Sequence, residues 1–219
     1  MLASGGLDSA VALAEAARKG PVAPVFVRSG LVWEPAEMYW LERFLQTIGA
    51  PPLVVLEMPV ADLYGRHWSL TGHDPPGSQT PDEAVYLPGR NLLLLSKAGV
   101  WAAGAGCVAI VMGPLLANPF PDGTRGFFDA MGEALGRGMG LEGPLPIETP
   151  LAELTKAEVV RRAAGLPIEL TFSCLAPTAD HRHCGACNKC AERRRGFAEA
   201  GADDPTGYAY GSRAGAGST

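Results

Sequence analysis

Short, almost purely apolar runs alternate with helical patterns along most of the chain. The clearest runs cover residues 24–27, 53–56 and 107–112. Strands that are apolar on both sides need cover on both faces, which is typical of parallel sheets. The alternation therefore predicts an α/β fold whose parallel sheet carries helices on both faces. In such a sheet, ligands bind outside the carboxyl ends of the strands, where the strand order reverses.

The helices are expected from their apolar periodicity and their end signals. The first begins at Leu7 and closes at Gly20. The others are expected at 37–48, 91–103, 125–135 and 155–164. Residues 69–82 have no periodicity and many turn formers, so we expect a long loop that is either mobile or a lid.

Composition excludes several classes of protein. A chain of 219 residues, 47% hydrophobic and 19% charged, can bury the core of one domain with a small appendage. Its net charge of −5 argues against a protein that coats nucleic acid. No apolar run is long enough to span a bilayer. The first residues lack the basic and hydrophobic regions of a secretory signal, so we expect a cytoplasmic protein.

Ser4-Gly5-Gly6-Leu7-Asp8-Ser9 lies directly before the first expected helix. The two glycines let the backbone bend and approach a ligand, and N–H groups at a helix start attract anions. Serine hydroxyls can donate to phosphate oxygens, whereas the Asp8 carboxylate suits Mg²⁺. An ordinary strand–turn–helix corner is the alternative, and the full six-residue string favours phosphate binding.

Only three residues precede this loop. Typical strands are longer than that. We therefore expect either a very short first strand or a natural start upstream of Met1.

Near the other end, four cysteines have the spacing C-x9-C-x2-C-x2-C, at Cys174, Cys184, Cys187 and Cys190. Such a cluster indicates a metal site in a reducing compartment rather than a disulfide framework. Four thiolates suit a closed, structural Zn²⁺ site, and an iron–sulfur cluster is the alternative that spacing leaves open. We expect His181 and His183 on the surface and Cys107 as a small core residue.

Two further segments carry charges of interest. Tyr86-Leu87-Pro88-Gly89-Arg90-Asn91 predicts a tight turn with Asn91 as the N-cap of the next helix. Arg90 can project from that turn to neutralise a phosphate or a carboxylate. Arg193, Arg194 and Arg195 follow the last cysteine on a helix. A solvated face is favoured there over an RNA contact, because the whole chain is acidic.

These motifs, together with Leu154-Thr155-Lys156-Ala157-Glu158, resemble the 7-cyano-7-deazaguanine synthase family, the ExsB-like branch of the PP-loop ATP pyrophosphatases. The resemblance covers roughly residues 1–200. It implies a Rossmann-like (adenine nucleotide alpha hydrolase-like) PP-loop domain over 1–165 and a four-cysteine zinc lobe over 166–200. We expect residues 201–219 to form a flexible tail.

The resemblance also implies an activity, that of an ATP-dependent carbon–nitrogen ligase of queuosine biosynthesis. Family members adenylate the carboxylate of 7-carboxy-7-deazaguanine, add ammonia to form an amide, and dehydrate the amide to the nitrile preQ0. Adenylation makes chemical sense because it turns a carboxylate oxygen into a good leaving group. Catalysis is then largely positioning and charge neutralisation.

Residue roles follow from the matched motifs. The resemblance implies that ATP with Mg²⁺ is bound by Ser4, Gly5, Gly6, Leu7, Asp8, Ser9, Arg90, Asn91 and Lys156. Asp8 and Arg90 are the expected catalytic residues. The expected substrate contacts are Gly113, Asp122 and Phe128. Zinc is expected at Cys174, Cys184, Cys187 and Cys190. A homodimer is the hypothesis for the assembly, which the sequence does not decide.

Two segments depart from the family pattern. Residues 118–128 keep Pro121, Asp122 and Phe128 but lack the family's Cys-Arg-Pro-Glu, and residues 29–33 replace Tyr-Gly-Gln-Arg-His. Phe120, Phe127 and Phe128 are candidates to stack on a flat heterocycle, with core packing as the ordinary alternative.

Three other functions are therefore weighed. They are a PP-loop ligase with another acceptor, a sulfur-transfer enzyme, and a non-catalytic zinc-bearing RNA-binding module. Sulfur transfer needs a thiol at the crevice, for which Cys107 is poorly placed. The net charge of −5 opposes RNA binding.

Overall fold

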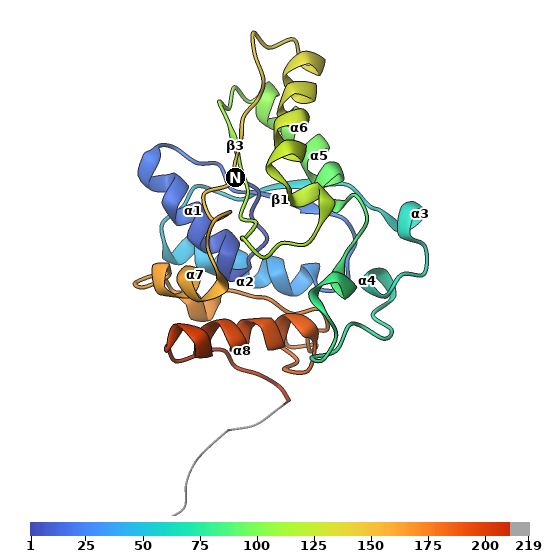
Figure 1. The fold of residues 1–219 in the computed structure, drawn as a ribbon, viewed down its shortest axis with the longest axis vertical. Coiled ribbons are helices and arrows are strands. Elements are labelled where there is room, and N and C mark those ends of the chain that lie inside the picture. Colours follow the sequence, from blue (N-terminus) through green and yellow to red (C-terminus); the bar gives the residue numbers. More distant parts are fainter. Residues whose placement is uncertain (211–219) are drawn as a thin grey trace, which may run out of the picture.

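A computed structural model describes residues 1–210, with a parallel sheet at its centre (Figure 1). β1 (Val25–Arg28) pairs with β2 (Val54–Glu57), and β3 (Ile110–Val111) pairs with β4 (Ile147–Glu148), both in parallel. Residues 1–3 join the two pairs, because Leu2 bridges Val25 and its N–H donates to the Val111 oxygen at 2.9 Å. In the order β2-β1-(1–3)-β3-β4, residues 1–3 contribute only an isolated bridge at Leu2, and the strand order reverses there.

Helices cover both faces of this sheet. They are α1 (Leu7–Lys19), α2 (Glu34–Thr47), α5 (Arg90–Gly104) and α6 (Arg125–Gly138). Side chains alternate along the strands, as the pleat requires. Phe26 and Val111 pack with α1 and α2 on one face. Val25 and Val27 pack under α5 on the other, and Ile110 packs there with both α5 and α6. This arrangement confirms the predicted α/β class.

The remaining helices are α3 (Ala61–Tyr64), α4 (Trp68–Thr71), α7 (Lys156–Arg162) and α8 (Asn188–Ala200). The predicted capping box opens α7, where Thr155 Oγ1 accepts from the Glu158 N–H and the Glu158 carboxylate accepts from the Thr155 N–H. α7 and α8 pack together at the base of the view in Figure 1. Among the described residues, no helix combines the length and hydropathy needed to cross a membrane.

Three local expectations differ from the structure. Only Ile110–Val111 of the 107–112 run forms regular strand, and Cys107 is half-buried just before it. α5 begins at Arg90 with Gly89 as its N-cap, so the prediction of Asn91 as the cap is wrong. Gly89 takes this position because its φ of 71° is left-handed and favours glycine.

The expected loop 69–82 is anchored rather than free. Its first residues belong to α4, and Gly77 forms a bridge with Cys187. The Asn188 N–H donates to the Pro76 oxygen at 2.9 Å. The segment is therefore joined to the cysteine lobe.

Residues 201–210 also pack on that lobe, although the expected tail begins at 201. The Ala209 N–H donates to the His183 oxygen at 2.8 Å, and the Tyr210 N–H donates to the Cys184 oxygen at 2.9 Å. The rest of the expected tail, 211–219, lies outside the described residues. The lobe thus extends past α8.

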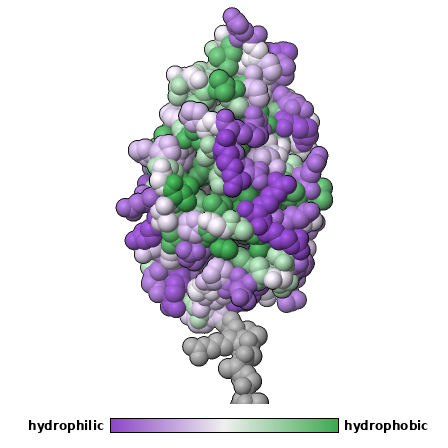
Figure 2. Space-filling view, turned by 90° about the vertical axis from the view of Figure 1, so that its left-hand side faces the viewer, coloured by the Kyte–Doolittle hydropathy of each residue, from purple (hydrophilic) through white to green (hydrophobic). Residues whose placement is uncertain are grey.

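The surface mixes apolar and polar side chains. On the face shown in Figure 2, hydrophobic residues emerge in patches bounded by hydrophilic ones. A globular protein leaves much apolar surface exposed, so such scattered patches are ordinary. They do not by themselves mark a site.

The packing of α6 predicts different effects on stability for alanine substitutions at two of its glycines. A Cβ at Gly132 would lie 2.7 Å from the Leu145 oxygen, whereas one at Gly126 would meet nothing within 4 Å. Gly132→Ala should lower the free energy of unfolding by ~1–3 kcal/mol through overpacking. Gly126→Ala, its control on the same helix, should be neutral or slightly stabilising. Urea titration of both variants measures this, and equal midpoints would contradict the packing described.

Candidate active site and metal centre

The loop from Ser4 to Ser9 is held from three sides. Gly5 has a φ of 77°, and a Cβ there would lie 2.9 Å from the Glu37 oxygen of α2. The Ser4 N–H donates to Ser9 Oγ at 3.0 Å, and the Phe172 N–H donates to the Gly5 oxygen at 2.7 Å. Only glycine fits this bend. The loop follows residues 1–3, at the reversal of strand order where ligands bind.

A chain of alternating charges runs beside the loop. Lys156 Nζ contacts the Asp8 carboxylate at 2.6 and 2.8 Å and the Glu192 carboxylate at 3.1 Å. Lys189 contacts Glu192 at 2.6 Å. Burial disfavours charge on Lys156, but Asp8 and Glu192 outweigh it and raise its pKa. Burial likewise opposes the charge of Glu192, yet Lys156 and Lys189 lower its pKa to about 2.

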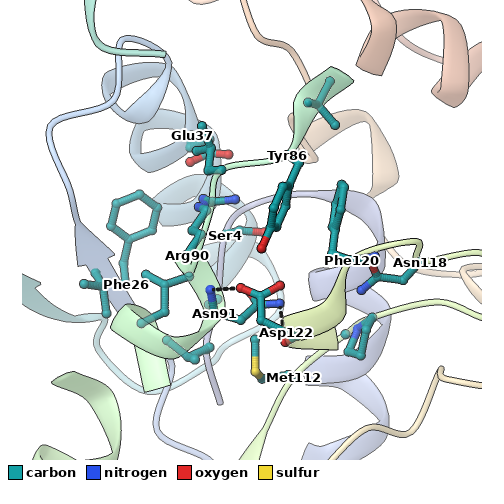
Figure 3. Close-up of a pocket in the computed structure, with 18 of the residues that line it drawn as sticks. Ser4, Phe26, Glu37, Tyr86, Arg90, Asn91, Met112, Asn118, Phe120 and Asp122 are labelled. Atoms are coloured by element: carbon teal, nitrogen blue, oxygen red, sulfur yellow. Dashed lines mark hydrogen bonds between the residues drawn. The ribbon is translucent and has the colours of Figure 1, made fainter. Parts of the chain in front are cut away.

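The loop opens onto two adjoining chambers of about 270 and 280 Å³. The wall residues common to both include Ser4, Glu37, Arg90, Gly113 and Phe120. The first chamber adds Tyr86, Asn91, Met112 and Asp122 (Figure 3). The second adds Trp33, Asp8, Lys156, Ser173 and Glu192. The structure therefore brings the loop from Ser4 to Ser9, Arg90, Asn91, Lys156 and Gly113 to one crevice.

Asp122 has a local structural task. Its Oδ2 accepts from the Asn91 N–H at 2.9 Å, and Asn91 Nδ2 donates to the Asp122 oxygen at 3.0 Å (Figure 3). A carboxylate that accepts at a helix start satisfies an unpaired N–H and favours the dipole. Asp122 and Asn91 thus fix the start of α5, and with it Arg90, at the chamber wall.

Phe128, one of the predicted substrate contacts, does not line the crevice. Phe128 is 1% exposed within the core under α6 and is not among the residues that line either chamber. Tyr86 and Phe120 line the first chamber instead, with stacked rings whose centroids are 5.0 Å apart (Figure 3). The expected substrate contact at Phe128 is therefore replaced by core packing, since its position on α6 faces the sheet.

Arg90 and two carboxylates of α2, Glu34 and Glu37, line the first chamber, and Arg90 and Glu37 also line the second. Arg90 Nε is buried and has no hydrogen-bond partner among the described residues. Glu34 accepts from the Ser29 and Gly30 N–H groups at 2.7 and 2.9 Å. Burial raises the pKa of Glu37 to about 8, which Arg90 opposes and Glu34 reinforces.

The four cysteines form a compact, buried cluster in which the sulfur atoms all lie within 4.8 Å of one another. Three sulfur pairs are 3.5, 3.9 and 3.9 Å apart. A tetrahedron with metal–sulfur bonds of ~2.3 Å has edges of about 3.8 Å, so the set fits one four-coordinate ion. An iron–sulfur cube binds each thiolate to a different iron, which would separate the sulfurs more widely.

Backbone N–H groups point at these sulfurs, as they do around bound thiolates. The N–H groups of Leu175, Cys184, Gly185, Ala186 and Cys187 each lie 3.2–3.4 Å from a cysteine sulfur. Such contacts favour charged sulfur in a buried place. The cluster is therefore a site for a metal ion.

Two side chains of this lobe are buried, contrary to expectation. His183 is 5% exposed and its Nε2 accepts from the Ser173 N–H at 2.9 Å. Burial lowers its pKa to about 3, so it is a neutral acceptor. Arg193 is 3% exposed and donates to Thr206, Thr171 and Ile168. The prediction of a solvated face is wrong for Arg193, because polar oxygens enclose its guanidinium.

Asn188, between the last two cysteines, joins the metal lobe to the crevice. It is fully buried, and its Nδ2 donates to the Thr80 oxygen at 2.8 Å and to Asp82 at 3.3 Å. The segment that it holds leads directly to Val85 and Tyr86 on the chamber wall. The cysteine cluster is thus connected, through Asn188, to the segment that forms part of the chamber wall.

Several crevice residues were missed by sequence reasoning. Glu34 and Glu37 lie on α2, and carboxylates three residues apart are common on the exposed face of any amphipathic helix. Glu192 was not among the predicted site residues, although its place two residues after a cysteine on α8 was a usable signal. Trp33 and Trp68 stack beside the second chamber, with centroids 5.5 Å apart. Nothing in their local sequence indicates that they meet.

Comparison with known proteins gives one consistent result. Residues 1–201 match the family described as "Queuosine biosynthesis protein QueC". The chain is 35% identical to the 7-cyano-7-deazaguanine synthase of Syntrophobacter fumaroxidans, over 95% of this chain and 94% of that protein. It is 33% identical to the enzyme of the same name from Methanothermobacter thermautotrophicus, over 94% and 96%. A glycine loop beside a two-chambered crevice and a buried cluster of four cysteines accompany that similarity, and the chain belongs to the QueC family.

Proposed function

We propose that this protein is a 7-cyano-7-deazaguanine synthase, which uses ATP and ammonia to convert 7-carboxy-7-deazaguanine into the nitrile. One observation carries the proposal. The similarity to synthases of that name spans almost the whole of both chains, and the loop from Ser4 to Ser9 faces a crevice with two adjoining chambers. The product would serve queuosine biosynthesis, as the family name indicates.

The second chamber is the proposed nucleotide site. Ser4, Ser9 and the N–H groups at the start of α1 would bind the ATP phosphates. Asp8, with Glu192 nearby, would hold Mg²⁺, and Lys156 would turn its ammonium toward the phosphates. A bound Mg²⁺ would neutralise charge on the phosphate oxygens as pyrophosphate departs.

The first chamber is the proposed acceptor site. Tyr86 and Phe120 offer aromatic faces for a flat deazapurine ring. Arg90 lines both chambers, so its guanidinium can bind the acceptor carboxylate next to the α-phosphate. The amide oxygen would be activated at the same place in the second round, so one crevice serves both steps.

The metal of the cysteine lobe is proposed to be zinc. Four thiolates close the coordination sphere, which leaves no position for substrate and gives the ion a structural role. Free thiols in this number suit the reducing cytoplasm. The proposed homodimer stays a prediction for solution measurements.

The other functions have less support. Cys107 lines neither chamber, so it cannot serve as a sulfur carrier there without a large movement. Arg193 is committed to protein oxygens, which removes one of the basic residues that favoured RNA.

Substitution of Asp8 tests the nucleotide site. Asp8→Asn keeps the shape but removes the charge, so turnover of ATP, ammonium and 7-carboxy-7-deazaguanine should fall about a hundredfold or more. Asp129→Asn, an exposed ion-paired carboxylate on α6, is the control and should turn over normally. Mass spectrometry of the deazapurine products reads both. Wild-type protein that forms neither amide nor nitrile would refute the proposed function.

Metal content tests the lobe. Elemental analysis of the purified protein should find one zinc per chain, and Cys187→Ser should lose the ion and unfold at lower temperature. Cys107→Ser is the matched control, because Cys107 lies outside the cluster. Iron in place of zinc, or zinc retained by Cys187→Ser, would contradict this assignment.

A further inference from the structure

The carboxylates around the crevice differ in how far they are already engaged. Those lining the two chambers are Asp8, Glu34, Glu37, Asp122 and Glu192. Asp8 and Glu192 are ion-paired with Lys156. Glu34 accepts two backbone N–H groups, and Asp122 caps α5. Among the described residues that line the chambers, Glu37 is the carboxylate whose oxygens make no hydrogen bond or ion pair.

The position of Glu37 is also set by the phosphate loop. Its own backbone oxygen packs against Gly5, so the turn of α2 that carries Glu37 lies directly on the loop. The side chain lines both chambers, and in Figure 3 its carboxylate lies beside the Arg90 guanidinium. This is the boundary where a nucleotide in one chamber would meet an acceptor in the other.

We propose that Glu37 is a catalytic residue, the base that takes a proton from the ammonium ion as its nitrogen attacks the activated carboxyl carbon. The inference rests on the proposed function and deepens it by assigning a proton acceptor. Ammonium carries no free electron pair, so it must lose a proton before it can attack. The other chamber carboxylates are held by partners that such a proton would displace.

In that step AMP is the leaving group, and the ammonium ion loses two protons. One N–H proton passes to the Glu37 carboxylate and a C–N bond forms at the acyl carbon. The C–O bond to the phosphoryl group breaks, and its electron pair leaves with AMP. A second proton leaves the nitrogen to solvent, which gives the neutral amide. Glu37 then returns its proton to water.

The surroundings of Glu37 suit a base that works near neutral pH. Glu34 faces it from the same helix and Arg90 from α5, with Ser4 of the loop on the chamber wall. Burial and Glu34 raise the pKa of Glu37, and Arg90 limits the rise, which ends at about 8. A general base is most effective when its pKa lies near the working pH, because part of it is then deprotonated while its affinity for a proton is still high.

Glu37→Gln tests the proposal by separating the chemical steps. Exchange of pyrophosphate into ATP, dependent on 7-carboxy-7-deazaguanine, reports adenylation and should stay within about threefold of wild type. Amide formation from ammonium at pH 7 should fall about a hundredfold. Hydroxylamine is already unprotonated at that pH, so hydroxamate formation should stay near the wild-type rate. Glu42→Gln, an exposed carboxylate on the same helix, is the control and should match wild type in all three assays.

Two results would overturn the assignment. Amide formation from ammonium by Glu37→Gln at the wild-type rate would show that Glu37 is not the base. An equal loss of pyrophosphate exchange and of the reactions with both nucleophiles would place Glu37 in substrate binding or in folding. Wild-type protein without carboxylate-dependent exchange would instead refute the proposed function itself, so the two failures are distinguishable.

Discussion

The close contact between Gly5 and the Glu37 carbonyl governs the rest of the site. It requires a residue without a Cβ at the first bend of the chain, in a left-handed conformation. With that contact made, α1 starts at the reversal of the sheet, and α2 brings Glu34 and Glu37 to the loop. The hydrogen bond from Phe172 to the Gly5 oxygen adds the lobe from the opposite side. The start of the chain, α2 and the segment around Phe172 are thereby held together at one short turn.

The lobe that carries the four cysteines is joined to two walls of the crevice. Asn188 is buried between two of the cysteines and holds residues 76–82, which lead to Tyr86 on the chamber wall. On the next turn of α8, Glu192 reaches Lys156 and so the phosphate loop. A metal ion held by the four cysteines would therefore order both of these walls of the crevice without lining it.

Much of this was predictable from the sequence, because local signals were strong. The glycine loop, the helix α1 and the four-cysteine spacing carry their geometry in adjacent residues, and the structure confirms the α/β class. The cap of α5 was misassigned because Asp122, more than thirty residues away, takes the capping role expected of Asn91 itself. Phe128 and His183 were misplaced for a similar reason, since burial depends on which elements pack together. The proximity of Glu37 to Arg90 arises only in three dimensions, because the two residues lie on different helices, and no local sequence pattern predicts it.

Arg193 has a consequence for where the folded unit ends. Its guanidinium, enclosed on α8, binds Thr171 and Ile168 on one side and Thr206 on the other, with Asp204 at 3.8 Å. The stretch beyond the last helix thus supplies the counter-charge for a cation hidden in the interior. A chain truncated after Ala200 would lose both Asp204 and Thr206 as partners of the buried Arg193 guanidinium. The shortest chain that folds stably is therefore expected to include residues beyond α8, although their composition is typical of a flexible tail.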